Sequence, residues 1–253
     1  MTNTNIIKSI LYHMLGMKYK VFIPKGNFCS IGNGFKFKNC RISVKGYNNK
    51  ISMGNNFRIK DFTIKIYGKN NEIIIGNNIL HEKAKLVGNL QIYINGSNNK
   101  IIIGDNIQIV TELIIYNHEN SQNCKIEIGN DTTFYKTEIY NYDIESSIKI
   151  GEDCMFGYDT IIYNTDGHAI FQNGNIINQA KNLTIGNHVW CGWGSTILKN
   201  SYIPNGCIVG KSAIVSKKFN EENAAIAGNP AKIIKENISW NRKTVNQILQ
   251  EKS

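Results

Sequence analysis

The chain has 253 residues, 42% of them hydrophobic, which is enough to bury a sizeable core and excludes a generally disordered chain. Lys and Arg number 29 against 19 Asp and Glu, so the formal net charge is +10, but the cations are scattered rather than clustered. The charge fits plain solubility or a partner that carries phosphates or carboxylates, and we expect no nucleic acid among the partners.

The sequence shows no sign of a membrane span or a metal site. No apolar run reaches the roughly 18–20 residues that a membrane span needs, and the N-terminal stretch lacks the features of a cleaved signal peptide. The six cysteines form no CxxC pair and match no zinc spacing. We therefore expect reduced thiols in a cytoplasmic protein without a metal site.

Residues 1–25 are expected to form an N-terminal helical segment, because apolar residues recur there at helical spacing. These residues are Ile7, Ile10, Leu11, Met14 and Leu15. We expect the segment to pack on the rest of the domain or on a neighbouring subunit. Contact of residues 1–20 with a membrane surface, helped by Lys8, Lys18 and Lys20, is the alternative.

A short unit recurs along the next part of the chain, in forms such as GYNNKISMGNN, GKNNEIIIGNN and GSNNKIIIGDN. Its glycines are Gly32, Gly54, Gly76, Gly104, Gly129, Gly151, Gly186 and Gly210, with steps of 22, 22, 28, 25, 22, 35 and 24 residues. Alternating apolar residues give a short strand with one buried face, and Gly and Asn then turn a corner at positive φ. One coil cannot bury its own face, so the repeat predicts a solenoid of stacked coils. A meander of hairpins, the alternative, would not recur so regularly.

An aliphatic or small residue recurs at every sixth position later in the chain. The positions are Ile185, Cys191, Ile197, Ile203, Val209 and Val215. Six residues on each of three faces give a triangular prism with 18 residues per coil. The earlier 22-residue coils then need extra residues at their corners. Residues 26–235 are therefore predicted to form one parallel β-helix, with the Cys191 side chain in its core.

The repeat is interrupted between Gly151 and Gly186, where the step is 35 residues, 13 more than the common 22. The excess lies at residues 165–181, TDGHAIFQNGNIINQAK, and we expect it to project as a loop from the prism. His168 lies at the start of this loop. An imidazole that titrates near neutrality suits a general base, although a lone loop histidine is more often solvated or structural. Asp166 would orient the ring or stabilise the corner.

Two tryptophans lie among small residues in the stretch VWCGWGS. Trp190 and Trp193 alternate with Gly192 and Gly194, a pattern that suggests a flat apolar wall beside exposed backbone amides. The alternative is that one tryptophan fills the core or a subunit interface.

The C-terminal tail, residues 236–253, is predicted to be a short helix folded back on the prism. Ser239 is its cap signal, and Trp240, Val245, Ile248 and Leu249 are its apolar residues.

The stretch IGNHVWCGWGSTILKNSYIPNGCIVGKSAIVSKKF, followed by AAIAGNPAKIIK, resembles the C-terminal coils of the hexapeptide-repeat acyltransferases. The branch it resembles holds galactoside, xenobiotic and capsular polysaccharide O-acetyltransferases. The detailed match covers about residues 150–236, and the earlier coils match only as a repeat. The resemblance implies an all-β, left-handed parallel β-helix with short terminal helices, an exception to the usual right-handed crossover. It also implies a homotrimer with active sites between subunits.

The resemblance further implies acetyl-coenzyme A as the donor substrate, with no bound cofactor, and a role for each matching residue. His168 would be the general base, and Trp190 would lie beside the reacting centre. The donor would contact Gly192, Trp193, Gly194, Gly210, Lys211, Ser216, Lys217, Lys232 and Lys235. Alanine is commoner in the family where Lys211 stands. Lys232 and Lys235 would offer ammonium groups to the nucleotide phosphates, or form a solvated face.

These inferences predict an O-acetyltransferase that moves acetyl from acetyl-CoA to a sugar hydroxyl of a surface polysaccharide. The acceptor would be a capsule, such as a sialic acid polymer, or a lipopolysaccharide. One alternative is N-acetylation of a nucleotide-linked amino sugar, but those enzymes often carry an additional N-terminal nucleotide-binding domain that this sequence does not show. Another is a non-catalytic β-helix scaffold, which would need neither the His168 loop nor the paired tryptophans.

Overall fold

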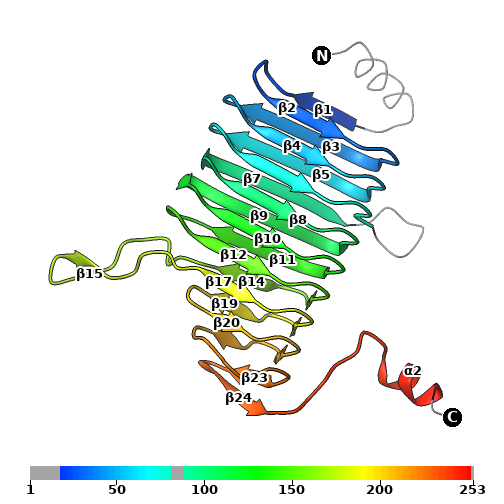
Figure 1. The fold of residues 1–253 in the computed structure, drawn as a ribbon, viewed down its shortest axis with the longest axis vertical. Coiled ribbons are helices and arrows are strands. Elements are labelled where there is room, and N and C mark those ends of the chain that lie inside the picture. Colours follow the sequence, from blue (N-terminus) through cyan, green and yellow to red (C-terminus); the bar gives the residue numbers. More distant parts are fainter. Residues whose placement is uncertain (1–17, 81–87, 252–253) are drawn as a thin grey trace.

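The computed structural model describes residues 18–80 and 88–251, and in these ranges the chain winds into a solenoid of parallel strands (Figure 1). Strand β1 lies at one end of the stack, and strands β23 and β24 lie at the other. Parallel pairs join equivalent strands of successive coils, with Ile51, Ile73 and Ile101 in register. The repeat in the sequence is therefore the repeat of the structure.

Three faces enclose the prism in its C-terminal half. The B face is the sheet of β2 (Phe28–Ile31), β4 (Lys50–Met53), β6 (Glu72–Ile75), β8 (Lys100–Ile103), β10 (Lys125–Ile128), β12 (Ser147–Ile150), β17 (Leu183–Ile185) and β20 (Tyr202–Ile203). The A1 face holds β13 (Met155–Phe156), β18 (Trp190–Cys191), β21 (Ile208–Val209), β23 (Ala225–Gly228) and β24 (Ala231–Lys235). The A2 face holds β14 (Thr160–Tyr163), β19 (Thr196–Leu198) and β22 (Ile214–Val215).

The earlier coils merge the A1 and A2 faces into single long strands. These strands are β3 (Lys36–Lys45), β5 (Arg58–Tyr67), β7 (Asn89–Ser97), β9 (Gln108–Gln122) and β11 (Thr133–Asn141), with β1 (Lys18–Phe22) paired to β3. The change occurs at β11, which pairs with β13 through Thr133 and with β14 through Thr137. The extra residues of the 22-residue coils, expected at the corners, thus lie partly in these longer strands.

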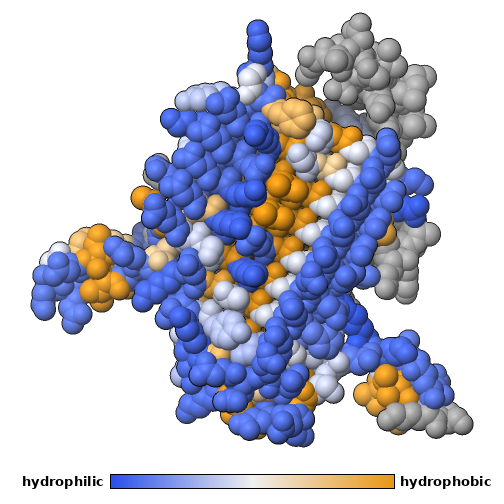
Figure 2. Space-filling model, viewed as in Figure 1, coloured by the Kyte–Doolittle hydropathy of each residue, from blue (hydrophilic) through white to orange (hydrophobic). Residues whose placement is uncertain are grey.

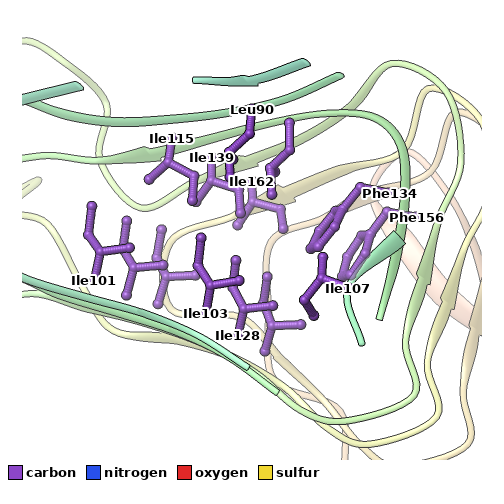
Figure 3. Packing of buried hydrophobic residues seen from close by; sticks show 14 of the residues in the cluster. Leu90, Ile101, Ile103, Ile107, Ile115, Ile128, Phe134, Ile139, Phe156 and Ile162 are labelled. Carbon is purple, nitrogen blue, oxygen red and sulfur yellow. The ribbon is translucent and has the colours of Figure 1, made fainter. Parts of the chain in front are cut away.

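Stacked isoleucines fill the interior, and Figure 3 shows them in rows. Ile101, Ile103 and Ile128 come from the B face, and Leu90, Ile115, Ile139 and Ile162 come from the opposite wall. Phe134 and Phe156 stack with ring centroids 5.0 Å apart. Burying each such side chain contributes about 1.5–3 kcal/mol, so the stability of the solenoid depends on coil-to-coil contact.

Asparagines stabilise the corners in two ways. Asn49, Asn71 and Asn99 are buried in a ladder, in which Asn71 Nδ2 donates to Asn49 Oδ1 at 2.9 Å and Asn99 Nδ2 to Asn71 Oδ1 at 3.1 Å. A second column turns the corner between the B and A1 faces with φ between 53° and 61°. It consists of Asn56, Asn78, Asn106, Asp131, Asp153 and His188. Short polar side chains tolerate this left-handed conformation, as the sequence predicted.

The terminal segments differ from the predicted helices. Residues 18–22 of the expected N-terminal segment form strand β1, while residues 1–17 lie outside the described residues. The C-terminal helix α2 (Val245–Gln250) is shorter than expected, has Thr244 rather than Ser239 as its N-cap, and buries none of its residues. Residues 236–243 instead run as a non-helical segment along the prism. Nowhere in the ranges 18–80 and 88–251 is there a helix with the length and apolar character of a membrane span.

Candidate active site

An arm projects from the corner between the A2 and B faces (Figure 1). It comprises residues 165–181 and ends in the antiparallel hairpin of β15 (Phe171–Gln172) and β16 (Asn175–Ile176). Apolar side chains are exposed along it, and they colour part of the arm orange in Figure 2. They are Ile170, Phe171, Ile176 and Ile177, each between 50% and 63% exposed. The described part of the chain leaves these side chains open to solvent.

The neck of the arm is fixed by polar contacts to the next coil. Lys199 Nζ donates to Asp166 Oδ2 at 2.5 Å and to the Asn178 carbonyl oxygen at 2.9 Å. Asn178 Nδ2 donates to the same Asp166 oxygen at 3.0 Å. The hydrogen bond from Lys199 holds the pKa of Asp166 below its usual value. Asp166 therefore anchors the arm, which is the corner-stabilising role considered from the sequence.

His168 stands immediately beyond this neck. Its carbonyl oxygen accepts a hydrogen bond from Asn178 Nδ2 at 2.7 Å, which fixes the backbone at this point. Its side chain is exposed and makes no hydrogen bond with any residue that the structure describes. The imidazole is therefore accessible to a ligand from solvent.

A strip of glycines runs along the A1 face beside Trp190. Gly157, Gly192 and Gly210 follow one another in successive coils, and a Cβ on Gly192 would lie 2.9 Å from the Lys211 nitrogen. A Cβ at each of these positions would press on the next coil, so glycine lets successive coils stack closely beside Trp190. Trp190 points outward from β18 with 37% of its surface exposed. Trp190 therefore does not fill the core, which was one alternative for this stretch.

Trp193 forms the wall at the corner between the A1 and A2 faces. Its ring lies 5.1 Å from that of Tyr158, and Lys211 Nζ lies 5.7 Å from its centroid. Gly194 adopts a φ of 69° here, and its nitrogen donates to the Tyr158 carbonyl oxygen. An aromatic ring with an adjacent ammonium group suits a ligand that has both an apolar arm and phosphates.

Two of the predicted lysines lie at the C-terminal end of the A1 face. Lys232 and Lys235 are on β24, where they pair with Ala227 and Ala225 of β23. Ala227 continues the glycine strip, since its Cβ lies 2.9 Å from a Cβ built on Gly210. The glycine strip therefore ends beside a strand that carries two cations.

The other two predicted donor residues lie elsewhere. Ser216 and Lys217 follow β22 at the corner between the A2 and B faces, where Lys217 Nζ lies 5.1 Å from the Phe219 ring centroid. This is the corner that carries the arm and His168. The four-residue strand β14 separates it from the tryptophan corner, a span of about 13 Å at 3.3 Å per residue. The predicted site residues of one chain therefore lie at two different corners.

Cys191, next to Trp190, points into the core. It is fully buried, and burial raises the pKa of its thiol well above the usual value. A thiol in this state is not a nucleophile. Within the described residues, no cluster of three or more His, Cys, Asp or Glu side chains could hold a metal ion.

Trp240 is a candidate site residue that the sequence reasoning missed, because it was assigned to the terminal helix. Its ring lies 6.1 Å from that of Trp190 and stacks on His188 with centroids 4.2 Å apart. The residues TVNQ, a capping box at Thr244, were the signal that the helix starts later and leaves Trp240 outside it.

Comparison with known proteins connects this geometry to a family. No protein-family model matches the chain. Over 131 residues, 51% of the chain, it is 37% identical to the polysialic acid O-acetyltransferase of Neisseria meningitidis, and the matched segment spans 60% of that protein. The crystal structure of the polysialic acid O-acetyltransferase OatWY superposes with a TM-score of 0.69 and 36% identity, over 83% of this chain and 95% of that one. The chain belongs to the hexapeptide-repeat acetyltransferases.

A second solved structure of this family agrees. The polySia-specific acetyltransferase NeuO superposes with a TM-score of 0.70 and 29% identity, over 84% of this chain and 93% of that one. The fold is therefore the left-handed parallel β-helix that the hexads and the family resemblance predicted. Both superpositions extend well beyond the residues 150–236 on which the resemblance rested, so the earlier coils share the fold of the family too.

Proposed function

We propose that the protein is an O-acetyltransferase that moves acetyl from acetyl-CoA to a hydroxyl of a surface polysaccharide, with a polymer of sialic acid as the acceptor. The observation that carries the proposal is the exposed His168 imidazole, fixed at the neck of an arm in a solenoid that also has a glycine and tryptophan wall. The names of two relatives point to the same acceptor. The net charge of +10 would attract a polyanion.

The donor would lie along the glycine strip. The pantetheine arm would lie against the outer surface beside the half-exposed Trp190, and the exposed Trp193 ring would cover it. Lys211, Lys232 and Lys235 would meet the phosphates at the nucleotide end. Among these, Lys211 already lies over Trp193, so its ammonium group would contact the donor phosphates and the indole ring at the same time.

The complete site would form between two copies of the chain. In one copy, His168, Ser216 and Lys217 lie at one corner, and Trp190 and the glycine strip lie on the A1 face. The exposed apolar side chains of the arm would pack on the neighbouring copy and bring His168 to its A1 face. In a closed ring of three copies, each arm would meet the A1 face of the next copy, so all three sites would be complete.

The chemical step follows from these placements. His168 takes the proton of the acceptor hydroxyl while that oxygen bonds to the thioester carbonyl carbon. Backbone amides and the Trp190 indole N–H would stabilise the oxyanion. The carbon–sulfur bond then breaks, and the departing CoA thiolate recovers the proton from the imidazolium. The buried Cys191 takes no part, so no acyl-enzyme forms.

The test follows release of CoA thiol from acetyl-CoA with sialic acid polymers, neutral oligosaccharides and UDP-linked amino sugars as acceptors. We expect release with the polymer and its loss in His168→Ala. His118→Ala is the matched control, because His118 is also exposed and packs on Tyr142 in the earlier coils. Turnover only with an amino sugar, or release that His168→Ala leaves unchanged, would contradict the proposal.

A further inference from the structure

Residues 236–243, here called the strap, cross the corner between the B and A1 faces. Arg242 anchors the strap: its Nε donates to Asp153 Oδ1 at 2.9 Å, and its Nη1 donates to Thr133 Oγ1 at 2.8 Å. Its Nη2 donates to the carbonyl oxygens of Asp131 and Cys154, both at 3.0 Å. One guanidinium therefore joins the strap to two successive coils. Such a fork of hydrogen bonds fixes position as well as adding energy.

Within the strap, the Trp240 ring packs between the His188 imidazole and the Trp190 indole. Only 9% of its surface is exposed, although it lies outside the prism interior. Its Nε1 donates to the His188 carbonyl oxygen at 2.8 Å, and its ring lies almost parallel to the imidazole, at 9°. The Trp190 ring is its other aromatic neighbour, 6.1 Å away. The position of Trp240 therefore limits where the Trp190 indole can lie.

His188 is the unusual member of its corner column. Its φ is 53°, at a position filled by asparagine or aspartate in the preceding coils. Both of its ring nitrogens face acceptors: Nδ1 lies 2.7 Å from Asp153 Oδ2, and Nε2 lies 3.2 Å from the Trp240 carbonyl oxygen. Neither a carboxylate nor a carbonyl donates, so only the doubly protonated imidazolium satisfies both contacts. A neutral ring keeps one contact and turns a lone pair toward the other acceptor.

Two charged side chains face this stack. Asp153 comes from the preceding coil and shares its carboxylate between His188 and Arg242. Arg242 comes from the strap, and its guanidinium carbon lies 5.7 Å from the Trp240 ring centroid. The carboxylate attracts a cation on His188, and the guanidinium repels one. The protonation state of the imidazole therefore decides whether both of its contacts can form.

We propose that the strap is a positioning element for Trp190 and that His188 is its latch, closed when the imidazole is protonated and loosened when it is neutral. Trp240 transmits the state of the latch to Trp190 by packing. The kinetic consequence rests on the proposed acetyl transfer, but the latch itself does not. Trp240 and His188 are thus positioning residues, since neither is placed on the reacting atoms.

The first test reads the latch without any turnover. The chain has three tryptophans, so intrinsic fluorescence is followed from pH 5 to pH 8.5 in the full-length protein. We expect one transition, with emission quenched at low pH because an imidazolium stacked on an indole quenches it. The transition should vanish in His188→Asn and in Trp240→Phe, and persist in the control His118→Asn. Asparagine suits the left-handed backbone at position 188 and keeps a donor toward Asp153.

Hydrogen exchange of the strap gives a second readout on the unaltered protein. The amide of Ile238 donates to the Asn223 carbonyl oxygen and reports on closure. After correction for intrinsic rates, its protection should fall at least threefold from pH 6 to pH 8. In Asp153→Asn, which lacks the counter-charge, the fluorescence transition should move to lower pH. Constant protection, or an unchanged transition in His188→Asn, would overturn the latch.

Kinetics then tests the link to Trp190. His188→Asn should lower kcat severalfold and leave the KM for acetyl-CoA unchanged, and Trp240→Phe should do the same. A rise in KM alone would contradict a positioning role. Where no acetyl transfer is detected with any acceptor, the fluorescence transition still decides the latch, so the two proposals fail separately.

Discussion

Lys199 Nζ lies 2.5 Å from Asp166 Oδ2, and this ion pair joins the neck of the arm to the following coil. The lysine side chain is 19% exposed and the aspartate side chain 38% exposed. A pair at this depth contributes modestly to global stability. Its importance is geometric: His168 is two residues from Asp166, so the ion pair that holds Asp166 also limits where His168 can lie.

Replacing Lys199 with methionine should separate these two effects. We expect the free energy of unfolding to fall by less than about 1 kcal/mol. If His168 is the base, as proposed, kcat should fall about tenfold because the residue is no longer held in place. Chemical denaturation and steady-state kinetics with the polymer measure the two quantities. The control is Lys243→Met, which removes a pair with Glu251 far from the arm. Equal kcat in the two variants would argue against the anchoring role.

Acid should release the neck. The hydrogen bond from Lys199 lowers the pKa of Asp166 relative to its usual value of 3.8. A depressed folded-state pKa means that the carboxylate stabilises the neck above the unfolded value, and that this contribution is lost as pH falls through the lowered pKa. Amide exchange of residues 166–178 should therefore accelerate in acid, and less so in Lys199→Met, where the bond is already absent. An identical acid response in both proteins would refute this reading.

Cys191→Ala should keep its turnover. The thiol is buried and its pKa is raised well above the usual value, so it offers neither access nor thiolate. We expect unchanged kcat and KM, and a loss of about 1 kcal/mol in unfolding free energy for the missing core atom. Intact-mass spectrometry should also show that acetyl-CoA leaves no acetyl group on the protein. A stable acetylated form that depends on Cys191 would reverse the assignment.

Lys232→Ala should weaken the binding of acetyl-CoA and leave the rate of the chemical step nearly unchanged. The lysine lies where the glycine strip ends, so the KM for acetyl-CoA should rise about tenfold with little change in kcat, as expected when a contact is lost equally in ground and transition states. The rise should shrink at high salt, where phosphate attraction is already screened. Lys243→Ala serves as the control cation. A fall in kcat without a change in KM would place Lys232 elsewhere in the mechanism.

Asn71→Ala should lower the free energy of unfolding by more than the loss of a few side-chain atoms alone would suggest. Its amide joins Asn49 to Asn99 inside the corner, so its removal leaves buried polar atoms unpaired and costs about 2–3 kcal/mol. Asn55→Ala removes an exposed amide that donates to Asn77 Oδ1 at 3.3 Å, and it should cost less than about 1 kcal/mol. Thermal unfolding of the two variants gives the comparison. Similar losses of stability in the two variants would mean that burial of the amide does not determine its contribution.

The coil architecture could be predicted because its cause is local. Ile185, Cys191 and Ile197 are all fully or almost fully buried, as hexad spacing requires. This pattern depends only on which residue recurs at which interval.

Contacts between distant segments could not be predicted. Asp166 and Lys199 are 33 residues apart, and Arg242 and Asp131 are 111 apart. No periodicity encodes such pairs, so the sequence offered Asp166 as a corner residue or ring orienter and gave Arg242 no role. Trp240 was misplaced for a different reason: apolar residues further on continued a helical pattern, and the capping box at Thr244 was not weighed against it.

The long-strand coils have a consequence for how such molecules change over time. In the described ranges 36–80 and 88–128, the coils pair with one another and contribute to the same isoleucine core. Duplication or loss of one such coil would change the height of the molecule by about 4.8 Å and leave both corners of the site intact. The height of the solenoid can therefore change while the coils that carry His168 and Trp190 stay the same.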